Sequence, residues 1–333
     1  MKKIILSAWL IFSMLMSYAQ SPKIAVVNSM GVTTIFSDIL SAYNYASNGD
    51  AIYLNGGVHH LNALIGKEIH IYGAGIDPDS CNVISRTLLQ VDYIGQGATN
   101  STFEGVVFVN TLQVYTYQPP PQNLKFKRCQ FNSLLHLNWA TNCIVEDCII
   151  LGGIQAIYTS MIQRNIFSTS AWGIASIYGG QVRNNIFLNA WENIFAPDYT
   201  TMDNNIFLGG NPISGAVNSN VYHNNLKIGT NPLAISPTDI ETNTMSENLP
   251  SDIFLNYPIV AIAFDFILDF HLRSSCVGHN AGTDGTDVGI YGTNYPVPEG
   301  WVPSNPHIYY KSVAEESNTN GKLPVHFKVR TGN

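Results

Sequence analysis

Three ionisable side chains recur at a spacing of 20 residues, namely Arg183, Asp203 and His223. If successive repeats stack, these side chains lie on neighbouring strands, where a base and a cation could act together on a uronate. The base would take the proton next to the carboxylate, and the cation would neutralise that carboxylate. A solvent-exposed row of charges has the same spacing. The set is therefore a weak catalytic candidate beside an ordinary charge ladder, and the sequence leaves both open.

A second set of side chains with regular spacing suits carbohydrate binding. Its members are Tyr158, Tyr178, Asp198 and Asn218. Aromatic faces cover the apolar side of a pyranose ring, and carboxylate or amide groups beside them bind its hydroxyls. Trp172 and Trp191, expected in the loops after neighbouring strands, would rim such a groove. The alternative is an exposed tyrosine stack that only stabilises cross-strand packing.

Two carboxylates in a turn-rich segment near the C-terminus are weak candidates for binding Ca²⁺. Asp284 and Asp287 flank a Gly-Thr pair within residues 281–292. Oxygen ligands of this kind suit calcium, but the spacing fits no EF-hand loop. Aspartates at such positions also cap turns. No other cofactor is indicated.

The cysteines give no metal motif. There are five of them, at positions Cys81, Cys129, Cys143, Cys148 and Cys276. The count is odd and the spacings match no zinc site. Cys129 and Cys148 occupy the same place in successive repeats, where two side chains point the same way and meet the geometry of a disulfide poorly. We expect buried thiols, with a disulfide as the alternative.

A repeat of about 20 residues must position these side chains. Its marker is an asparagine column at Asn165, Asn185, Asn205 and Asn225, which Cys148 and Cys129 continue towards the N-terminus. Apolar residues recur three positions before this column and two positions after it. Like residues in register are what stacked parallel coils require, and stacked amide side chains can bond to one another. An antiparallel barrel would mirror the pattern instead of repeating it.

The N-terminus reads as a secretory signal peptide. A basic start at Lys2 and Lys3 precedes an apolar run, and Ser17-Tyr18-Ala19 fits a cleavage site. The alternative, a membrane anchor, would need a longer apolar run. Cleavage before Gln20 removes the two lysines and changes the net charge from −7 to −9. An acidic exported chain is a poor partner for nucleic acid.

A helix is expected just before the first repeat. Residues 34–46 have helical spacing of apolar side chains, and Ser37 or Asp38 is the candidate N-cap. A short helix here would cover the open strand edge of the first coil, which otherwise invites aggregation.

The N-terminal order of elements resembles the pectin-lyase-like superfamily of right-handed parallel β-helices. Residues 49–57 follow the expected helix, and residues 67–75 fit a K-x-I-x-I-x-G-x-G pattern. Residues 281–292 are similar to the ends of β-helix proteins exported by Bacteroidetes-type bacteria. The resemblance implies a substrate groove along the sheet that carries Tyr158 and Tyr178. The motifs of polygalacturonase-like, pectin-esterase-like and pectate-lyase-like enzymes are absent; residues 277–280 hold only a fragment of Gly-His-Gly.

These observations predict one all-β domain, a right-handed parallel β-helix with an N-terminal capping helix. We expect a signal peptide over residues 1–19, the β-helix over 20–292 and an extended C-terminal segment over 293–333. The functional prediction is a secreted protein that binds a polysaccharide or a cell-surface glycan, without demonstrable catalysis. A polysaccharide lyase or glycoside hydrolase acting on a uronic-acid-containing glycan is the alternative.

Overall fold

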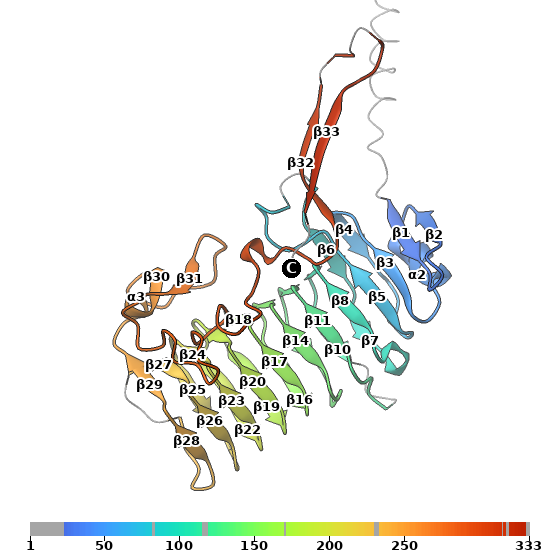
Figure 1. The fold of residues 1–333 in the computed structure, drawn as a ribbon. Coiled ribbons are helices and arrows are strands. Elements are labelled where there is room, and N and C mark those ends of the chain that lie inside the picture. The colour runs from blue at the N-terminus through green and yellow to red at the C-terminus, as the bar shows by residue number, and fades with distance from the viewer. Residues whose placement is uncertain are drawn as a thin grey trace, which may run out of the picture.

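The chain winds into a right-handed parallel β-helix, as the repeat and the family resemblance imply (Figure 1). The computed structural model describes residues 23–81, 84–114, 119–169, 171–229, 233–314, 316–317 and 320–330. The expected signal peptide, residues 1–19, lies outside the described residues. Among the described residues, no helix has the length and apolar character needed to cross a membrane.

Three stacked sheets form the walls of the coil, and we call them sheets A, B and C. Sheet A contains, in spatial order, β2 (Thr33–Phe36), β1 (Ile24–Val27), β3 (Asp50–Tyr53), β5 (Ile69–Tyr72), β8 (Thr102–Glu104), β11 (Lys125–Lys127), β14 (Ile144–Glu146), β17 (Met161–Gln163), β20 (Gln181–Arg183), β23 (Thr201–Asp203), β26 (Val221–His223) and β28 (Ile240–Thr242). Sheet B contains β4 (Gly57–His60), β6 (Thr87–Gln90), β9 (Val107–Phe108), β12 (Gln130–Phe131), β15 (Ile149–Ile150), β18 (Ile166–Phe167), β21 (Ile186–Phe187), β24 (Ile206–Phe207), β27 (Leu226–Ile228) and β29 (Met245–Glu247). Sheet C contains β7 (Tyr93–Ile94), β10 (Leu112–Val114), β13 (Leu135–His136), β16 (Ile154–Tyr158), β19 (Trp172–Tyr178), β22 (Glu192–Asp198) and β25 (Asn211–Ser214).

The asparagine column forms the corner between sheets A and B, and its amide side chains bond to one another as predicted. The Oδ1 atom of Asn185 accepts hydrogen bonds from the backbone N–H of Asn165 at 2.9 Å and from its Nδ2 at 3.0 Å. Asn185 Nδ2 in turn donates to Asn205 and to the backbone oxygen of Ile162. The preceding residue is in the left-handed region, with φ = 54° at Asn184, which asparagine tolerates. Asn-Asn therefore both turns the chain and satisfies buried backbone groups.

The interior of the coil is filled by rows of like side chains. Phe187 pairs with Phe167 on one side and with Phe207 on the other, with ring centroids 4.6 Å and 5.0 Å apart. All three rings are buried. The register is parallel throughout this stack, which excludes the antiparallel alternative. Truncating one such ring to alanine would cost about 3–5 kcal/mol.

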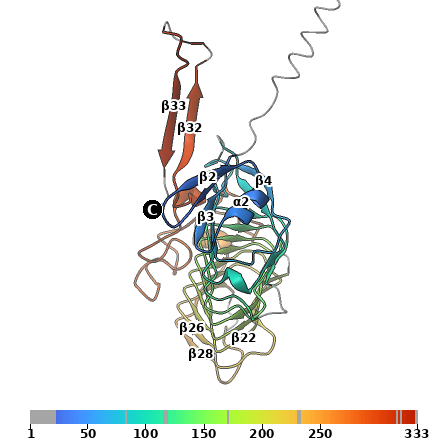
Figure 2. The ribbon, with the colours of Figure 1, turned by 90° about the vertical axis from the view of Figure 1, so that its right-hand side faces the viewer.

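The N-terminal cap contains the predicted helix. It is α2 (Ile39–Tyr45), and its N-cap is Asp38, whose side chain accepts from Ser41 N at 2.8 Å. The helix is shorter than the expected span, because residues 33–36 form β2 instead. Strands β2 and β1 add antiparallel to β3 at the end of sheet A. Figure 2 looks onto this end of the coil, with α2 and β2 near the viewer.

The last strand of the stacked sheets is β29, so the chain leaves the coil well before residue 292. It continues through α3 (Pro250–Ile253), β30 (Phe254–Asn256), β31 (Asp269–Leu272) and the short helix η2 (Glu299–Trp301). We call residues 250–305 the strap. Figure 1 shows the strap running back from the C-terminal rungs towards the N-terminal ones. Within residues 259–272 the structure has one strand, β31, which pairs with β30 outside the coil.

The strap covers an outward-facing apolar row on sheet B. This row and the strap share a second hydrophobic cluster, separate from the interior of the coil. The row includes Ile149, Ile166, Ile186, Ile206 and Leu226, and the strap contributes Phe254, Phe270, Leu272, Val288, Ile290, Val297 and Trp301. After Asn165, Asn185 and Asn205, the isoleucine that follows thus faces the strap, while the phenylalanine after it faces the interior. After Asn225, Leu226 takes the outward position.

After the strap, the chain ends in a hairpin of β32 (His307–Val313) and β33 (Val325–Arg330), which projects from the coil (Figure 1). Both strands lie within the segment 293–333, which was expected to be extended.

All five cysteines are free and buried. Cys148 Sγ accepts a hydrogen bond from the backbone N–H of Cys129 at 3.3 Å, so these two thiols take the place of asparagines in the ladder. Burial raises the pKa of the Cys143 thiol to about 11, which keeps it in the unreactive protonated form.

Candidate functional site

The two tyrosines proposed as a sugar platform stack on the outer side of sheet C. Tyr158 and Tyr178 are partners in adjacent strands, with ring centroids 4.9 Å apart and planes 14° from parallel. On the next rungs, Asp198 pairs with Tyr178, and Asn218 Nδ2 donates to Asp198 Oδ1 at 3.1 Å. Four successive rungs therefore present two aromatic rings, then a carboxylate and then an amide.

Two aromatic residues that the sequence reasoning missed extend this platform. Trp139 lies edge-on to Tyr158 at 5.2 Å, and Tyr199 lies edge-on to Tyr178 at 5.3 Å. Both are more than half exposed. Their backbones are in the left-handed region, with φ = 72° and φ = 50°. Such a conformation costs on the order of 1–3 kcal/mol for a large side chain. At Tyr199 it belongs to the regular turn of the coil, because Thr159, Gly179 and Ser219 share it.

A signal for Tyr199 is present in the repeat. Tyr199 occupies the turn column that also holds Gly179 and Ser219, one position after the tyrosine column. A bulky aromatic where small residues otherwise occur is unusual, because glycine or asparagine fits the left-handed conformation better. The short rung around Trp139 is out of phase with the repeat, and no spacing argument would identify it.

The two tryptophans expected at the rim lie at the start of sheet C strands. Trp172 begins β19, and so is not in a loop; its Nε1 donates to Glu192 Oε2 at 2.8 Å. Its ring lies against Phe195, with centroids 5.7 Å apart. Trp191 directly precedes β22 and is 73% exposed. The rim role of both residues stays a prediction.

A row of outward residues runs along the middle of sheet C between these two groups. In register it comprises Tyr93, Gln113, His136, Gln155, Ala175, Phe195 and Ser214. Burial lowers the pKa of His136, so its imidazole is mostly neutral near neutral pH. The face is thus long, rich in amides and aromatics, and contains few charges.

The three weak catalytic candidates stack on the outside of sheet A, as their spacing predicts. Arg183 pairs with Asp203, and Asp203 pairs with His223. The side chains nevertheless form two groups. His223 Nδ1 lies 2.9 Å from Asp203 Oδ1, whereas Arg183 Nε turns the other way and donates to Gln163 Oε1 at 2.9 Å.

Next to Arg183, a buried charge network spans the preceding rungs. Arg164 donates to Asp147 at 2.6 Å and to Glu146 at 3.0 Å, and Lys125 lies 3.0 Å from the second oxygen of Glu146. Burial alone would raise the pKa of Glu146, but Lys125 and Arg164 outweigh it and lower the pKa. Burial raises the pKa of Asp147, an effect that Arg164 only partly offsets. Sequence spacing identified Arg183 but not this network.

The two calcium candidates cap local turns. Asp284 Oδ1 accepts from the N–H and hydroxyl of Thr286, and Asp287 Oδ1 accepts from the backbone N–H of Asn280. Burial alone would raise the pKa of Asp284, but the bonds from Thr286 lower it, with a smaller contribution from Arg183. Among the described residues, no three His, Cys, Asp or Glu side chains are grouped to hold a metal ion.

Comparisons with known proteins give no match at the level of sequence. No protein-family model and no curated protein matches the sequence. Among solved structures, the pectin methylesterase from Aspergillus niger, in deglycosylated form, is similar over 72% of this chain and 90% of that chain, with 13% sequence identity and a TM-score of 0.42. No residue of the site is assigned from this likeness.

Proposed function

We propose that this protein binds a polysaccharide along the outer face of sheet C. The observation that carries this proposal is the parallel stack of Tyr158 and Tyr178, extended edge-on by Trp139 and Tyr199. Rigid aromatic rings provide a large contact area at a low cost in conformational entropy. Trp139 and Tyr199 are each more than half exposed, so their rings are accessible to a ligand.

The shape and chemistry of the face favour a chain-like ligand over a small one. Aromatic, amide and carboxylate groups continue over successive rungs about 5 Å apart, so a ligand with its own repeat can meet several of them. Gln113, Gln155 and Asn218 supply both donors and acceptors for hydroxyl groups. The near-absence of cations on this face suits a neutral glycan.

The location of the protein is part of the proposal. The basic and then apolar N-terminus supports export, and an exported acidic protein meets glycans outside the cell or at its surface. We propose no nucleic-acid partner, because the chain is acidic.

The alternative is a lyase or hydrolase that acts on a uronic-acid-containing glycan. The observation in its favour is the pair of His223 and Asp203 at 2.9 Å, because a carboxylate that orients an imidazole is a common arrangement for a general base. Arg183 bonds to Gln163 and not to this pair, so the cation needed beside the base is not directed towards it.

Binding and product formation are measured together on a panel of neutral glycans and polyuronates. We expect saturable binding of at least one glycan by calorimetry, and about a tenfold loss of affinity in Tyr178→Ala, equivalent to about 1.4 kcal/mol. Tyr178→Phe keeps the ring and should retain binding. Tyr310→Ala, an exposed tyrosine on the terminal hairpin, is the matched control.

The outcomes separate the two functions. If no glycan binds, or if Tyr178→Ala binds as the unchanged protein does, the binding proposal fails. If unsaturated uronate or new reducing ends form, and Asp203→Asn abolishes them, the protein is an enzyme and the alternative holds.

A further inference from the structure

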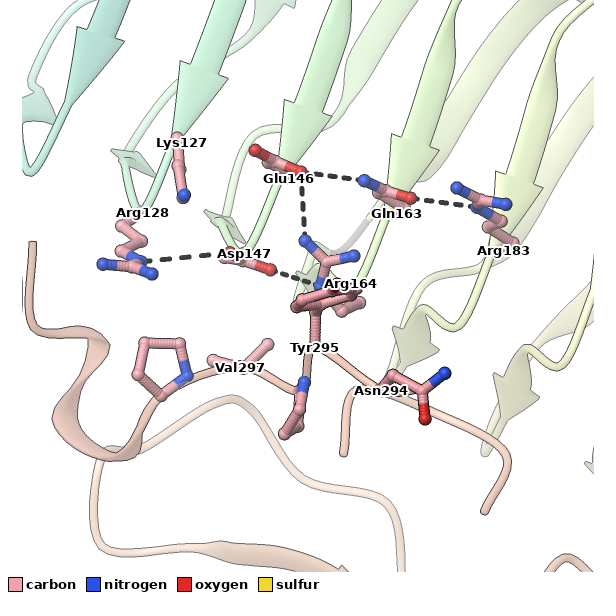
Figure 3. A pocket seen from close by; sticks show the side chains of 12 residues that line it. Lys127, Arg128, Glu146, Asp147, Gln163, Arg164, Arg183, Asn294, Tyr295 and Val297 are labelled. Carbon is pink, nitrogen blue, oxygen red and sulfur yellow. Dashed lines mark hydrogen bonds and ion pairs between the residues drawn. The ribbon is translucent and has the colours of Figure 1, made fainter. Parts of the chain in front are cut away.

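A pocket lies between the strap and the corner at which sheet A turns into sheet B (Figure 3). Its volume is about 680 Å³. One wall consists of charged and polar side chains from four successive rungs, which begin with Lys127 and end with Arg183. The opposite wall is residues 294–298 of the strap, which include Tyr295, Pro296 and Pro298.

The strap wall is held in place at its C-terminal side by buried polar contacts. Arg128 Nη1 donates to the backbone oxygen of Val302 at 2.7 Å. The N–H and hydroxyl of Ser304 both donate to the carboxylate of Glu104. Val297 is buried in the cluster between the strap and sheet B. The strap wall is therefore anchored at and after Val297.

The carboxylates along the pocket are matched by cations. Glu104 lies 3.6 Å from Arg128. Glu146 and Asp147 share Arg164, and Lys125 adds a second cation to Glu146, as described above. The middle of the pocket is therefore close to electrically neutral.

The first and last side chains of the charged wall, Lys127 and Arg183, are cations without a carboxylate partner. The side chain of Lys127 forms no hydrogen bond or ion pair with the part of the chain that the structure describes, and Figure 3 shows it beside the pocket. Arg183 donates to Gln163 and to Met161 Sδ, and neither acceptor is charged. Asp284 lies close enough to be affected by Arg183 but forms no ion pair with it. In a chain with net charge −7, two such cations facing one pocket indicate an anionic ligand.

We propose that this pocket binds an extended dianion, with one acidic group at Lys127 and the other at Arg183. The two residues are separated by three strand spacings in register, through Glu146 and Gln163, or about 14 Å between their backbones. A short dianion reaches only one of them. The middle of the ligand lies between the amide of Gln163 and the ring of Tyr295, so it combines polar groups with an apolar face.

The shared chemistry is two carboxylates held apart, and two kinds of molecule supply it. One is an acidic oligosaccharide with an acid group near each end, and the other is a long aliphatic dicarboxylate. Both belong to the test. The site is distinct from the aromatic face of sheet C and goes beyond the function proposed there, because it binds anions through sheet A.

The experiment measures the affinity of the full chain for α,ω-dicarboxylates of increasing length, from succinate to dodecanedioate, and for uronate oligomers of two to four units. Calorimetry at low salt is suitable, because added salt screens such contacts. We expect affinity to rise with the separation of the two acids and to exceed that of the matching monocarboxylate. A preference for oligomers over aliphatic diacids would identify the sugar as the source, and the reverse would identify the aliphatic acid.

Two variants test the assignment of the ends. Arg183→Gln and Lys127→Gln should each lower the affinity for the long dianion about tenfold and remove its advantage over the monocarboxylate. Lys311→Gln, on the exposed hairpin, changes the net charge equally and should bind as the unchanged protein does. Thermal unfolding of each variant checks that the fold is retained.

The proposal is overturned if no dianion binds, if a monocarboxylate binds equally well, or if both glutamine variants bind as Lys311→Gln does. Tyr178→Ala separates this site from the glycan face, because it should leave dianion binding unchanged. Loss of glycan binding in this variant with dianion binding retained would show that the two sites are separate. If the unchanged protein binds a dianion but no glycan, the glycan proposal fails and the dianion proposal stands.

Discussion

At the residue scale, the asparagine ladder is a chain of buried amides in which each member satisfies the backbone of its neighbours. Asn185→Ala removes an acceptor from the N–H of Asn165 and a donor to Ile162. Each buried polar group left unpaired costs about 1–3 kcal/mol. We expect the free energy of unfolding to fall by about 3 kcal/mol, measured by urea titration. Asn48→Ala, an exposed asparagine, should change it by less than about 0.5 kcal/mol.

The buried Glu146 makes a prediction about acid stability. Its pKa is held below the ordinary value of 4.5 in the folded state, so its contribution to stability is fully present above that value. The contribution is lost as the pH falls through the lower folded pKa. Glu146→Gln should therefore destabilise the protein at neutral pH, and the difference from the unchanged protein should shrink on acidification.

Urea unfolding over a pH series from neutral to acid measures that difference. Asp147 has a raised pKa and favours folding in acid, so the comparison must be between variants and not of the absolute curve. Glu316→Gln, which has an exposed side chain, is the control. A difference that is constant with pH would contradict the assignment of the lowered pKa to Glu146.

Side chains that repeat were predictable, and those that break the phase were not. The stacking of Tyr158 on Tyr178 and of Asp203 on His223 follows from identical spacing in successive rungs. Which neighbour a flexible side chain bonds to does not follow from spacing: Arg183 has Asp203 on one side and Gln163 on the other, and it turns to Gln163. Trp139 lies in a rung of different length, so no column contains it.

At the scale of elements, the strap protects an apolar row that the coil alone would expose. Ile290 is buried between the strap and sheet B. Ile290→Asp places a charge in this layer, which is costly without a partner. We expect increased binding of a hydrophobic dye and new protease cleavage within residues 250–305. The circular dichroism of the coil should persist, because the interior rows are untouched.

Ile267→Asp is the matched control for the strap, since Ile267 is in the same segment but 77% exposed. It should bind no more dye than the unchanged protein. If Ile290→Asp also leaves dye binding and cleavage unchanged, the strap is not what shields the isoleucine row.

The stacked strands could be predicted from the sequence, but the strap could not. Each rung carries its own register signal, because a buried aromatic and an asparagine recur at fixed positions. The strap has no period, and its apolar residues occur at irregular intervals from Phe254 to Trp301. One sign of the strap was available in the sequence. The residue after a ladder asparagine is apolar, as at Ile186 and Ile206, and so is the next residue, which already fills the interior. Two adjacent apolar residues in a strand require cover on both faces.

At the scale of the whole molecule, the terminal hairpin is separable from the rest. All side chains of β33 are exposed, and its strand partner is β32. Removing residues 307–333 therefore takes away almost no buried surface from the coil. We expect the thermal unfolding midpoint to change by less than about 2 °C. A larger fall would show that the hairpin contributes to the stability of the coil.

The N-terminal cap, in contrast, should determine whether the protein stays monomeric. Strand β1 pairs with β3, and α2 buries Ile39 and Tyr43 against the first coil. Tyr43 also bonds to the backbone of Leu64 at 3.0 Å. Removing residues 24–46 would expose both the edge of β3 and the apolar interior beneath α2. An exposed strand edge of this kind pairs with other chains.

We therefore expect the variant without residues 24–46 to form soluble aggregates or filaments at concentrations at which the unchanged protein remains monodisperse. Light scattering and size-exclusion chromatography measure this directly. The variant without the hairpin is the control, because it loses a similar number of residues from an exposed part of the fold and should remain monodisperse. If both deletions behave alike, protection of the strand edge is not the role of the cap. Asp38→Ala would then be expected to have no effect on association. If the cap does protect the edge, loss of this helix N-cap should weaken α2 by about 1 kcal/mol. Aggregation of Asp38→Ala should then begin at a lower temperature.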